Sequence, residues 1–341
     1  MREEHEKREK ELLSIFATKS VDTKGRRRSH DKCPIRTEFQ KDRDRITHSK
    51  AFRRLMHKTQ VFISPEGDHY RTRLTHTLEV AQIARTVSRA LRLNDDLTEA
   101  IALGHDLGHT PFGHTGEDAV NKLLPGGFRH NEQSVRVVRH LENEGRGLNL
   151  TFEVEDGMLN HRSACFPSTL EGRVVQICDK IAYMNHDVDD ALRAKILAPD
   201  DLPSYVSGIL GPTPSGRIDF LVKNLVNHSL QSMGEENTIE ARVSLSPDVA
   251  AVMKELRTFL FAHVYANQLH TKERSKIQDM LGLLYGHYMA YPEKLPKEIQ
   301  ASYDIDASQA VADYIAGMTD RFAAKRFREI FIPASWDVIG G

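Results

Sequence analysis

The chain has 341 residues, of which 40% are hydrophobic and 28% are charged. This balance is typical of a globular protein with a substantial core, and it excludes a chain that is mainly disordered or fibrous. Lysine and arginine number 47 against 48 aspartate and glutamate residues, a formal net charge of -1. A balance this close to neutral argues against a surface devoted as a whole to nucleic acid.

Nothing in the sequence suggests export or a membrane partner. The first residues, MREEHEKREKELL, are charged rather than apolar, and no run of about 18 apolar residues occurs. Three cysteines, Cys33, Cys165 and Cys178, are widely spaced and form no CxxC pair. The sequence thus predicts neither a disulfide framework nor a thiolate zinc site, and we expect a cytoplasmic protein.

Apolar residues recur at helical spacing along most of the chain, whereas alternating strand patterns are short. In chain order, helices are expected over 74–93, 95–106, 170–194, 218–232, 247–266, 271–290 and 306–318. The sequence therefore predicts an all-α fold.

Composition divides the chain into four parts. Residues 1–35 form a polar, basic arm, and residues 36–196 hold every reactive constellation and form the predicted catalytic core. Residues 197–217 concentrate Pro, Gly and Ser and are predicted to form a loop. Residues 218–341 form a C-terminal helical region, which is expected to serve packing and oligomer contacts.

Four side chains on the predicted helices have the chemistry of metal ligands: His76, the adjacent pair His105 and Asp106, and Asp179. A hydrolytic metal site needs several imidazole or oxygen ligands and an open position for water or substrate. Neighbouring residues on a helix point about 100° apart, so the adjacent pair can reach one ion only near the helix end. An isolated His-Asp pair is most often incidental, so its surroundings decide its meaning.

The segment HDLGHTPFGHTGE, residues 105–117, follows this pair. Pro111 disfavours helix at Thr110, which predicts a loop over the metal. Its imidazoles, and His130 downstream, are suited to phosphate contact or proton transfer near neutral pH. The alternative is a histidine-rich surface loop without a function.

Two further features point to a charged ligand. Asp179, Tyr183 and Asp187 are spaced four apart and share one helical face, with Lys180 beside them; the alternative is a solvated acidic face. Arginines gather between residues 41 and 73, ahead of His76, and their planar guanidinium groups favour a phosphorylated ligand. Among them, Arg73 shares a helical face with His76.

Five ordered blocks give the chain a specific resemblance. They are DRDRITHSKAFRRLMHKTQVF (42–62), YRTRLTHTLEVAQIAR (70–85), GHDLGHTPFGHTGE (104–117), FRHNEQS (128–134) and CDKIAYMNHDVDDA (178–191). With these blocks the chain resembles the deoxyguanosinetriphosphate triphosphohydrolase-like family, the bacterial dNTPase branch of the HD-domain metallohydrolases. The resemblance implies an HD-domain helical bundle with additional C-terminal helices.

The resemblance also implies a reaction and a set of roles. A dNTP is cleaved to a deoxynucleoside and triphosphate with the help of a divalent metal ion, Mg, Mn, or another transition metal such as Fe, Ni or Zn. The implied metal ligands are His76, His105, Asp106 and Asp179. The implied catalytic residues are His114 with its acidic partner Glu117, and His109 and His130. The implied substrate contacts are Arg53, Arg73, Lys180, Tyr183 and Asp187.

Relatives of this size imply a homo-oligomer, a tetramer or hexamer, activated by a dNTP at subunit interfaces. Arg26–Arg28, Arg43 and Arg45 are candidates for that second site, and an exposed basic arm is the alternative. Two other functions stay open: an HD-domain 5′-monophosphatase or phosphodiesterase, and a non-catalytic regulator that binds nucleotides or, weakly, single-stranded DNA. The sequence leaves the preferred dNTP, the native metal and the acid or base role of His114 undecided.

Overall fold

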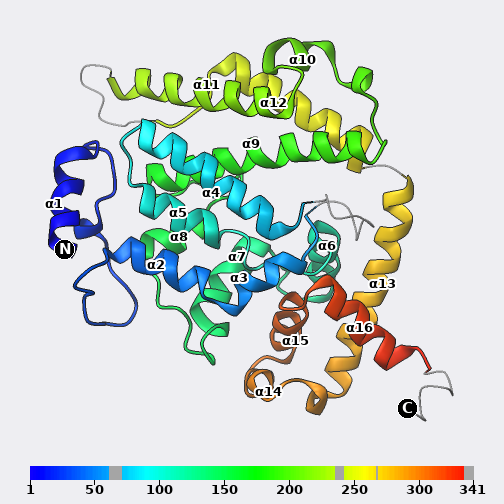
Figure 1. Ribbon diagram of the computed structural model, residues 1–341. Helices are drawn as coiled ribbons and strands as arrows, with labels where there is room; N and C mark the ends of the chain where they lie inside the picture. Colours follow the sequence, from blue (N-terminus) through cyan, green and yellow to red (C-terminus); the bar gives the residue numbers. More distant parts are fainter. Residues whose placement is uncertain (61–70, 235–241, 266–267, 334–341) are drawn as a thin grey trace, which may run out of the picture.

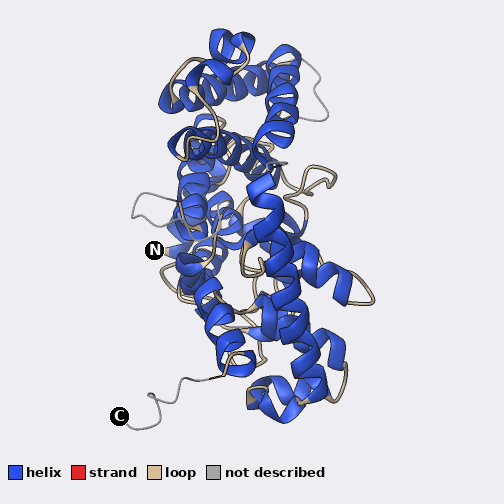
Figure 2. Cartoon of the chain, turned by 90° about the vertical axis from the view of Figure 1, so that its right-hand side faces the viewer, coloured by secondary structure: helices blue, strands red, loops and turns tan. Residues whose placement is uncertain are grey.

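The fold is known from a computed structural model that describes residues 1–60, 71–234, 242–265 and 268–333. Within these ranges the chain folds into helices α1 to α16 with short 3-10 and π-helical turns, and the only β-pairing is two isolated bridges. Figure 2 shows helices joined by loops, with no strand drawn in the described part. The predicted all-α class is confirmed.

Five helices form the central layer and surround the main core. α4 packs against α5 and α9, and α2 packs against α5 (Figure 1). Fully buried apolar residues such as Val80, Ile101 and Ile181 fill the space between them. The bounds of these helices are α2 Glu38–Thr47, α4 Arg73–Ala90, α5 Asp95–Gly104, α8 Phe152–Leu159 and α9 Leu170–Arg193.

Side-chain caps fix where the helices of the central layer begin. Thr72 accepts a hydrogen bond from the Thr75 backbone at the start of α4, and Asn94 accepts one from Leu97 at the start of α5. Thr169 caps α9 in the same way. Each cap satisfies a backbone N–H that the helix itself cannot pair, so the three helices that carry candidate ligands start at defined positions.

The N-terminal arm is attached to the central layer. It contains α1, Arg2–Leu12, which lies beside the layer in Figure 1. The side chain of Arg26 is only 3% exposed and forms ion pairs with Glu38 and Asp42 of α2. A buried arginine needs such partners, so these pairs hold the arm against the core.

A second group of helices, α10 Ser204–Leu210, α11 Pro214–Gly234 and α12 Pro247–Leu260, lies over α9 (Figure 1). A π-helical turn, Phe261–Tyr265, continues α12. α10 lies inside 197–217, where a loop was expected, and α11 already begins there. The reason is tertiary: Val206 and Leu210, four residues apart, are buried in the main core, and a helix brings both to one face.

The third group builds a separate core at the other end of the molecule (Figure 1). α6 packs against α13, which comes much later in the chain, and α13 packs also against α15 and α16. Phe112 and Val120 therefore lie in one cluster with Leu284 and Val311. The remaining bounds are α3 Lys50–Arg54, α6 Gly113–Leu123, α7 His130–Arg136, α13 Gln268–Ala290, α14 Lys297–Tyr303, α15 Ala307–Ala316 and α16 Asp320–Phe331, and a π-helical turn, Val137–Leu141, follows α7.

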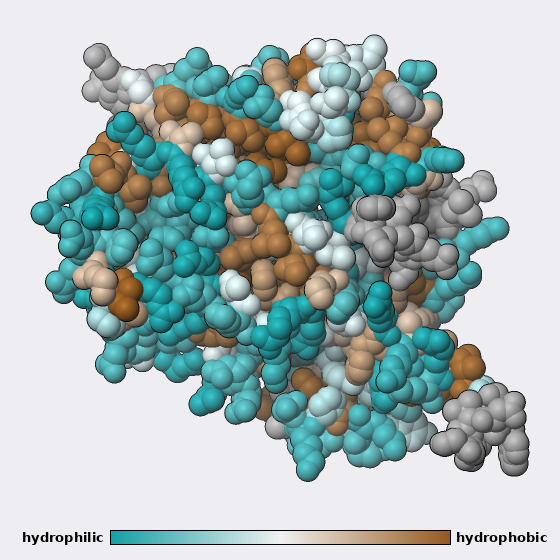
Figure 3. Space-filling view, in the orientation of Figure 1, coloured by the Kyte–Doolittle hydropathy of each residue, from teal (hydrophilic) through white to brown (hydrophobic). Residues whose placement is uncertain are grey.

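The surface is mostly hydrophilic, with apolar side chains gathered over the α10–α12 layer and near the middle of the face shown in Figure 3. None of the described helices is both long and apolar enough to cross a lipid bilayer.

Candidate active site

Four predicted ligands converge from the central layer. His76 lies in the first turn of α4, His105 and Asp106 follow the end of α5, and Asp179 lies on α9. The His76 Nε2 is 3.1 Å from the Asp179 Oδ1. The His105 Nε2 lies 3.4 Å from the Asp106 Oδ1 and 3.8 Å from the Asp179 Oδ1. The structure thus brings together residues that are far apart in the sequence.

The chemistry of these four residues fits a divalent metal ion. The His105 Nδ1 donates to the Ala102 carbonyl at 2.6 Å, which leaves the lone pair on a buried Nε2 that has no hydrogen-bond partner. A ring held in this way is the usual arrangement of a metal-binding histidine. Ligand atoms of His76, His105 and Asp106 all lie within 4.8 Å of one another.

Both carboxylates of this set are held in the charged form. Burial alone would raise the pKa of Asp179, but the hydrogen bond from His76 and the nearby imidazoles lower it to about 2. Burial likewise opposes ionisation of Asp106, yet the neighbouring His105 and His109 imidazoles and the Arg73 guanidinium keep its pKa well below the usual value. Two carboxylates and two imidazoles provide the hard ligand set that a hydrolytic metal needs.

Glycines let the following loop lie close to its neighbours. A Cβ on Gly108 would be 2.2 Å from the backbone nitrogen of Ser134, and one on Gly116 would be 1.9 Å from the Pro111 carbonyl oxygen. Phe112 ends the loop with a φ of 63°, the left-handed region. The loop therefore runs from His105 to Phe112, and α6 begins at Gly113, within the segment that was expected to be a loop.

Three histidines gather beside the proposed metal ligands. The rings of His109 and His130 stack with 3.9 Å between centroids, and the ring of His114 is 5.4 Å from that of His109. His109 and His130 are buried, whereas the side chain of His114 is 76% exposed. Of the three imidazoles, His114 is thus the one that an incoming ligand can reach.

Glu117 connects two of these histidines. Its carboxylate lies 3.2 Å from the His114 Nδ1, and both of its oxygens lie 3.0 Å from the His130 Nδ1. Burial would raise the pKa of Glu117, but the hydrogen bonds with His114 and His130 hold it far below the ordinary range. The charged carboxylate therefore accepts from both rings.

His161 completes this network, although nothing in its sequence spacing predicted it. Its Nδ1 donates to the Met158 carbonyl at 2.7 Å, and its Nε2 faces the His130 Nε2 at 3.1 Å. Burial lowers the pKa of His161 to about 3, so the ring is neutral and its Nε2 can only accept. Both ring nitrogens of His130 are thus engaged, Nε2 with His161 and Nδ1 with Glu117.

Because both nitrogens of His130 are engaged, two questions can be answered: which group is the better metal site, and which histidine is better placed to exchange a proton. Asp106, His109 and His130 form a second group with ligand atoms within 4.8 Å of one another, but both nitrogens of His130 are already engaged. The first group is therefore the better metal site. With His130 committed at both nitrogens, the exposed His114 is the better placed of the two to exchange a proton with a bound ligand.

The face of α9 that carries Asp179 continues along the helix with Tyr183, which is half-buried, and Asp187, which is buried. Burial raises the pKa of Tyr183 and lowers that of Lys180, and it raises the pKa of Asp187 to about 7. The Tyr265 hydroxyl of the π-helical turn donates to Asp187. Sequence reasoning missed Tyr265, because it comes from the C-terminal region, where no reactive constellation was recognised.

The two predicted arginines behave differently. Arg73 is buried, and its guanidinium donates to Asp106 at 2.7 Å and to the Thr59 carbonyl at 3.2 Å. It thus supports a candidate metal ligand. Arg53 is exposed on α3 and donates to the His48 carbonyl at 2.9 Å, and within the described ranges it has no recorded contact with the other candidate residues.

The arginines considered for a second nucleotide site are largely satisfied within the chain. Besides the buried Arg26, Arg43 pairs with Asp96 at 3.1 Å, and Arg45 donates to the Asn149 carbonyl at 2.6 Å. This part of the chain carries less free positive charge than its sequence suggests.

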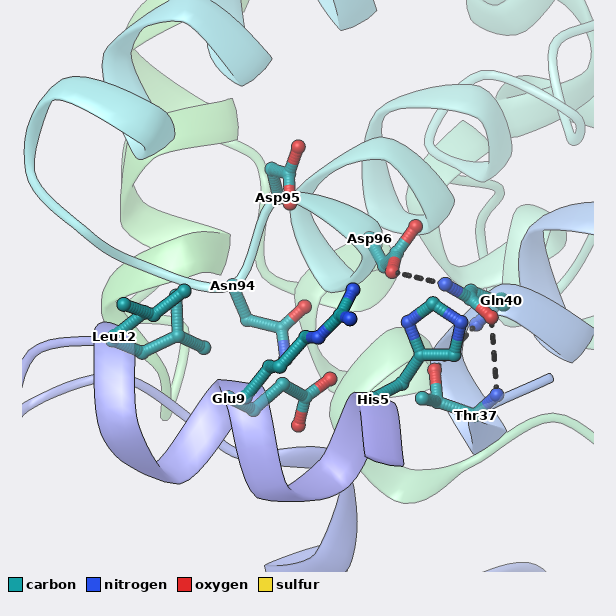
Figure 4. Close-up of a pocket in the computed structure, with 10 residues that line it drawn as sticks. His5, Glu9, Leu12, Thr37, Gln40, Asn94, Asp95 and Asp96 are labelled. Atoms are coloured by element: carbon teal, nitrogen blue, oxygen red, sulfur yellow. Dashed lines mark hydrogen bonds between the residues drawn. The ribbon is translucent and has the colours of Figure 1, made fainter. Parts of the chain in front are cut away.

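A surface hollow of about 180 Å³ lies nearby, between α1, α2 and α5, away from the histidine cluster (Figure 4). Its acidic groups already have partners: Glu9 accepts from Ser20 at 2.7 Å, and Asp96 accepts from Gln40 at 2.8 Å. The acidic side chains that line the hollow are therefore already engaged. The candidate active site is instead the cluster formed by the four candidate metal ligands and the neighbouring histidines.

The chain is similar to several known proteins and to two family models. The chain matches the HD domain over residues 73–184 and the phosphohydrolase-associated domain over residues 243–329. A deoxyguanosinetriphosphate triphosphohydrolase-like protein from Caldanaerobacter subterraneus subsp. tengcongensis is 57% identical over 98% of this chain and 97% of its own. Proteins of the same name from Desulfatibacillum aliphaticivorans and Thiobacillus denitrificans are 49% and 40% identical, over 98% and 93% of this chain and 98% and 96% of their own. A solved structure of a hypothetical protein from Aquifex aeolicus aligns with a TM-score of 0.48 at 16% identity, over 85% of this chain and 71% of that one.

The HD domain is a metal-dependent hydrolase fold, and it spans all four candidate metal ligands. Together with the relatives, it supports a phosphohydrolase. At this identity and coverage, the chain belongs to the deoxyguanosinetriphosphate triphosphohydrolase-like family.

Proposed function

We propose that the protein is a dNTP triphosphohydrolase, which converts a dNTP and water to a deoxynucleoside and triphosphate. The observation that carries the proposal is a four-residue ligand set beside a histidine, His114, that is exposed and held by a charged Glu117. The printed names of the relatives supply the substrate class. A binding protein has no need of such a proton-transfer pair.

His76, His105, Asp106 and Asp179 would hold the metal ion, which supplies charge stabilisation at a phosphate oxygen and an activated water. In the reaction, the water oxygen becomes bonded to the α-phosphorus, and the bond from that phosphorus to the 5′ oxygen breaks. The leaving 5′ oxygen must gain a proton. His114 donates it from Nε2, because its Nδ1 is held by Glu117 and a deoxynucleoside alkoxide is a poor leaving group without a general acid.

The remaining groups bind and orient the substrate. Lys180 on α9 is placed to offset phosphate charge, and Tyr183 and Asp187 follow along the same helix face toward the sugar. Tyr265 orients the Asp187 carboxylate through its hydroxyl. Arg73 contributes by holding Asp106, and a direct phosphate contact from Arg73 or Arg53 stays a prediction.

Product analysis tests this function. The purified protein is incubated with each dNTP and Mg²⁺ or Mn²⁺, and the products are separated. Triphosphate and deoxynucleoside in equal amounts support the proposal. Release of orthophosphate or pyrophosphate alone would assign another HD-domain phosphohydrolase, and tight nucleotide binding without turnover would assign a regulator.

His105→Ala is expected to abolish hydrolysis and metal retention while leaving the fold intact. His57→Ala, at an exposed histidine whose side chain has no recorded contact with the cluster in the described ranges, is the matched control and is expected to keep both. Light scattering with and without each dNTP tests the expected tetramer or hexamer and its activation by nucleotide. A salt-sensitive shift of single-stranded DNA by the His105→Ala variant tests the weak DNA binding.

A further inference from the structure

A buried carboxylate of the C-terminal helices contacts the loop 105–112, called the catalytic loop below. Asp320, the first residue of α16, is 5% exposed. Its Oδ1 accepts from the Phe112 backbone N–H at 2.9 Å. Its Oδ2 accepts from the Thr59 backbone N–H at 3.0 Å and also from the Thr59 hydroxyl. All recorded side-chain hydrogen bonds of Asp320 in the described structure thus lead away from α16 toward the candidate active site.

Both partners of Asp320 lead directly to candidate catalytic groups. Phe112 ends the loop that carries His109 and precedes α6, which carries His114 and Glu117. The Thr59 carbonyl accepts from Arg73, whose other nitrogen holds Asp106 at 2.7 Å. The Asp320 carboxylate therefore contacts both the residue that precedes α6 and the residue that accepts from Arg73, which in turn holds the candidate metal ligand Asp106.

A second contact reinforces the first. Lys58, which is buried, donates from Nζ to the carbonyl of Ala316, at the end of α15, at 2.8 Å. The same ammonium donates to the His109 carbonyl. The turn between α15 and α16 is thereby tied to the catalytic loop at two places, Phe112 and His109.

α15 also holds the helix that carries His130. The carboxylate of Asp313, which is buried, accepts from Gln133 at 2.9 Å and from Arg136 at 2.8 Å, both on α7. In addition, Ala119 and Val120 of α6 lie in the C-terminal core. The central layer positions the metal ligands, whereas the C-terminal helices contact the segments that carry the histidines.

We propose that Asp320 is a positioning residue for hydrolysis, which fixes the loop 105–112 and the start of α6 so that His114 faces the substrate. The proposal rests on the proposed function for the reaction that is measured, and its structural half is independent of it. Loss of the carboxylate leaves a buried backbone N–H without an acceptor, so the loop gains alternative positions. A catalytic group that moves by about 1 Å can lose about a hundredfold in rate.

The test compares Asp320→Ala and Asp320→Asn with Glu329→Gln. Glu329 lies on the same helix and is 41% exposed, and its recorded ion pairs within the described residues are with Lys325 and Arg326. We expect kcat to fall about a hundredfold in Asp320→Ala and about tenfold in Asp320→Asn, which keeps one acceptor, with KM within about threefold. Metal content stays at the wild-type level, and deuterium uptake rises in peptides that cover 105–117. Glu329→Gln matches the wild type in every measurement.

Unchanged kcat and unchanged uptake in Asp320→Ala would overturn the proposal, as would a loss of kcat that is matched by uptake throughout the molecule. If Asp320→Ala does not fold, Thr59→Val, which removes only the hydroxyl contact, is expected to give a smaller change of the same pattern. If the wild type hydrolyses no dNTP, the proposed function fails. The deuterium uptake of 105–117 then still decides whether Asp320 positions this loop.

Discussion

Replacing Glu117 by Gln tests the proton-transfer group most directly. The substitution keeps the size of the side chain but removes its charge and turns one acceptor oxygen into a donor. In the structure both oxygens are used, because one or both accept from His130 and one accepts from His114. The amide oxygen of the introduced glutamine can accept a hydrogen bond from one ring, either His114 or His130. Its NH₂ group, which only donates, then faces the other ring.

The expected loss follows from these contacts. A hydrogen bond to a charged group contributes about 1.5–3 kcal/mol. Its loss at His114 in the transition state alone corresponds to a decrease in kcat of about ten- to a hundredfold. Where its NH₂ group faces Nδ1, the His114 ring no longer holds a proton there and is a neutral imidazole, whose Nε2–H is a far weaker acid than that of an imidazolium. We therefore expect kcat to fall at least about a hundredfold, within the range of about 10²–10⁴ for a lost general acid.

The assay follows triphosphate release at saturating metal and dNTP. Glu132→Gln is the control, because Glu132 lies near His130 but is 57% exposed, and in the described part of the chain its recorded ion pair is with Arg129 at 3.5 Å. Wild-type metal content in both variants would show that the metal ligands are intact. A Glu117→Gln enzyme with kcat within about threefold of the wild type would refute the role of this carboxylate.

Three further predictions concern metal, pH and packing. Saturating metal, at about one hundred times its Kd, should raise the free energy of unfolding by about 2.7 kcal/mol, and chelation should remove this gain together with hydrolysis, as seen in urea titrations. Because burial raises the pKa of Asp187 from 3.8 to about 7, the native state binds the extra proton, so stability falls as the pH rises through this range; relative to Asp187→Asn, metal-free protein should lose roughly 2 kcal/mol between about pH 5 and pH 7. Gly116→Ala should lower the free energy of unfolding by about 3 kcal/mol, since its Cβ would lie 1.9 Å from the Pro111 oxygen, whereas Gly126→Ala, with open space around it, should be near neutral.

Much of the fold was predictable because helical periodicity is local. The expected helices 74–93 and 170–194 correspond to α4 and α9. Thr72 and Thr169 cap the N-termini of these two helices and so fix where they begin. The helix α10 was not predicted, because Pro and Gly around it are typical of loops and its reason lies in burial of Val206 and Leu210. The identity of a buried position is a tertiary property that composition does not reveal.

The candidate site likewise contains residues that the sequence identified and residues that only the structure identified. His76, His105, Asp106 and Asp179 were recognisable as candidates because their residue types and order resemble those of a known family. His161, Tyr265 and Asp320 carry no such pattern. Each acts through contacts with segments at least 31 residues away, as in the His130–His161 pair and in the bonds from Phe112 and Thr59 to Asp320. Such contacts have no periodicity or spacing, so only the fold reveals them.

The contacts that the C-terminal helices make with α6 and with the loop 105–112 assign these helices a part in building the candidate active site. If the central layer alone made the active site, the C-terminal helices would serve only packing, and the strength of their attachment would not affect catalysis. Instead, α6 carries His114 and Glu117 on one side and packs Val120 into the C-terminal core on the other. We therefore expect a ligand that shifts α13 or α16 to move His114, the proposed proton donor, relative to the candidate metal ligands. Such coupling requires no change in the central layer, because Asp320 and Lys58 form its connection to the loop.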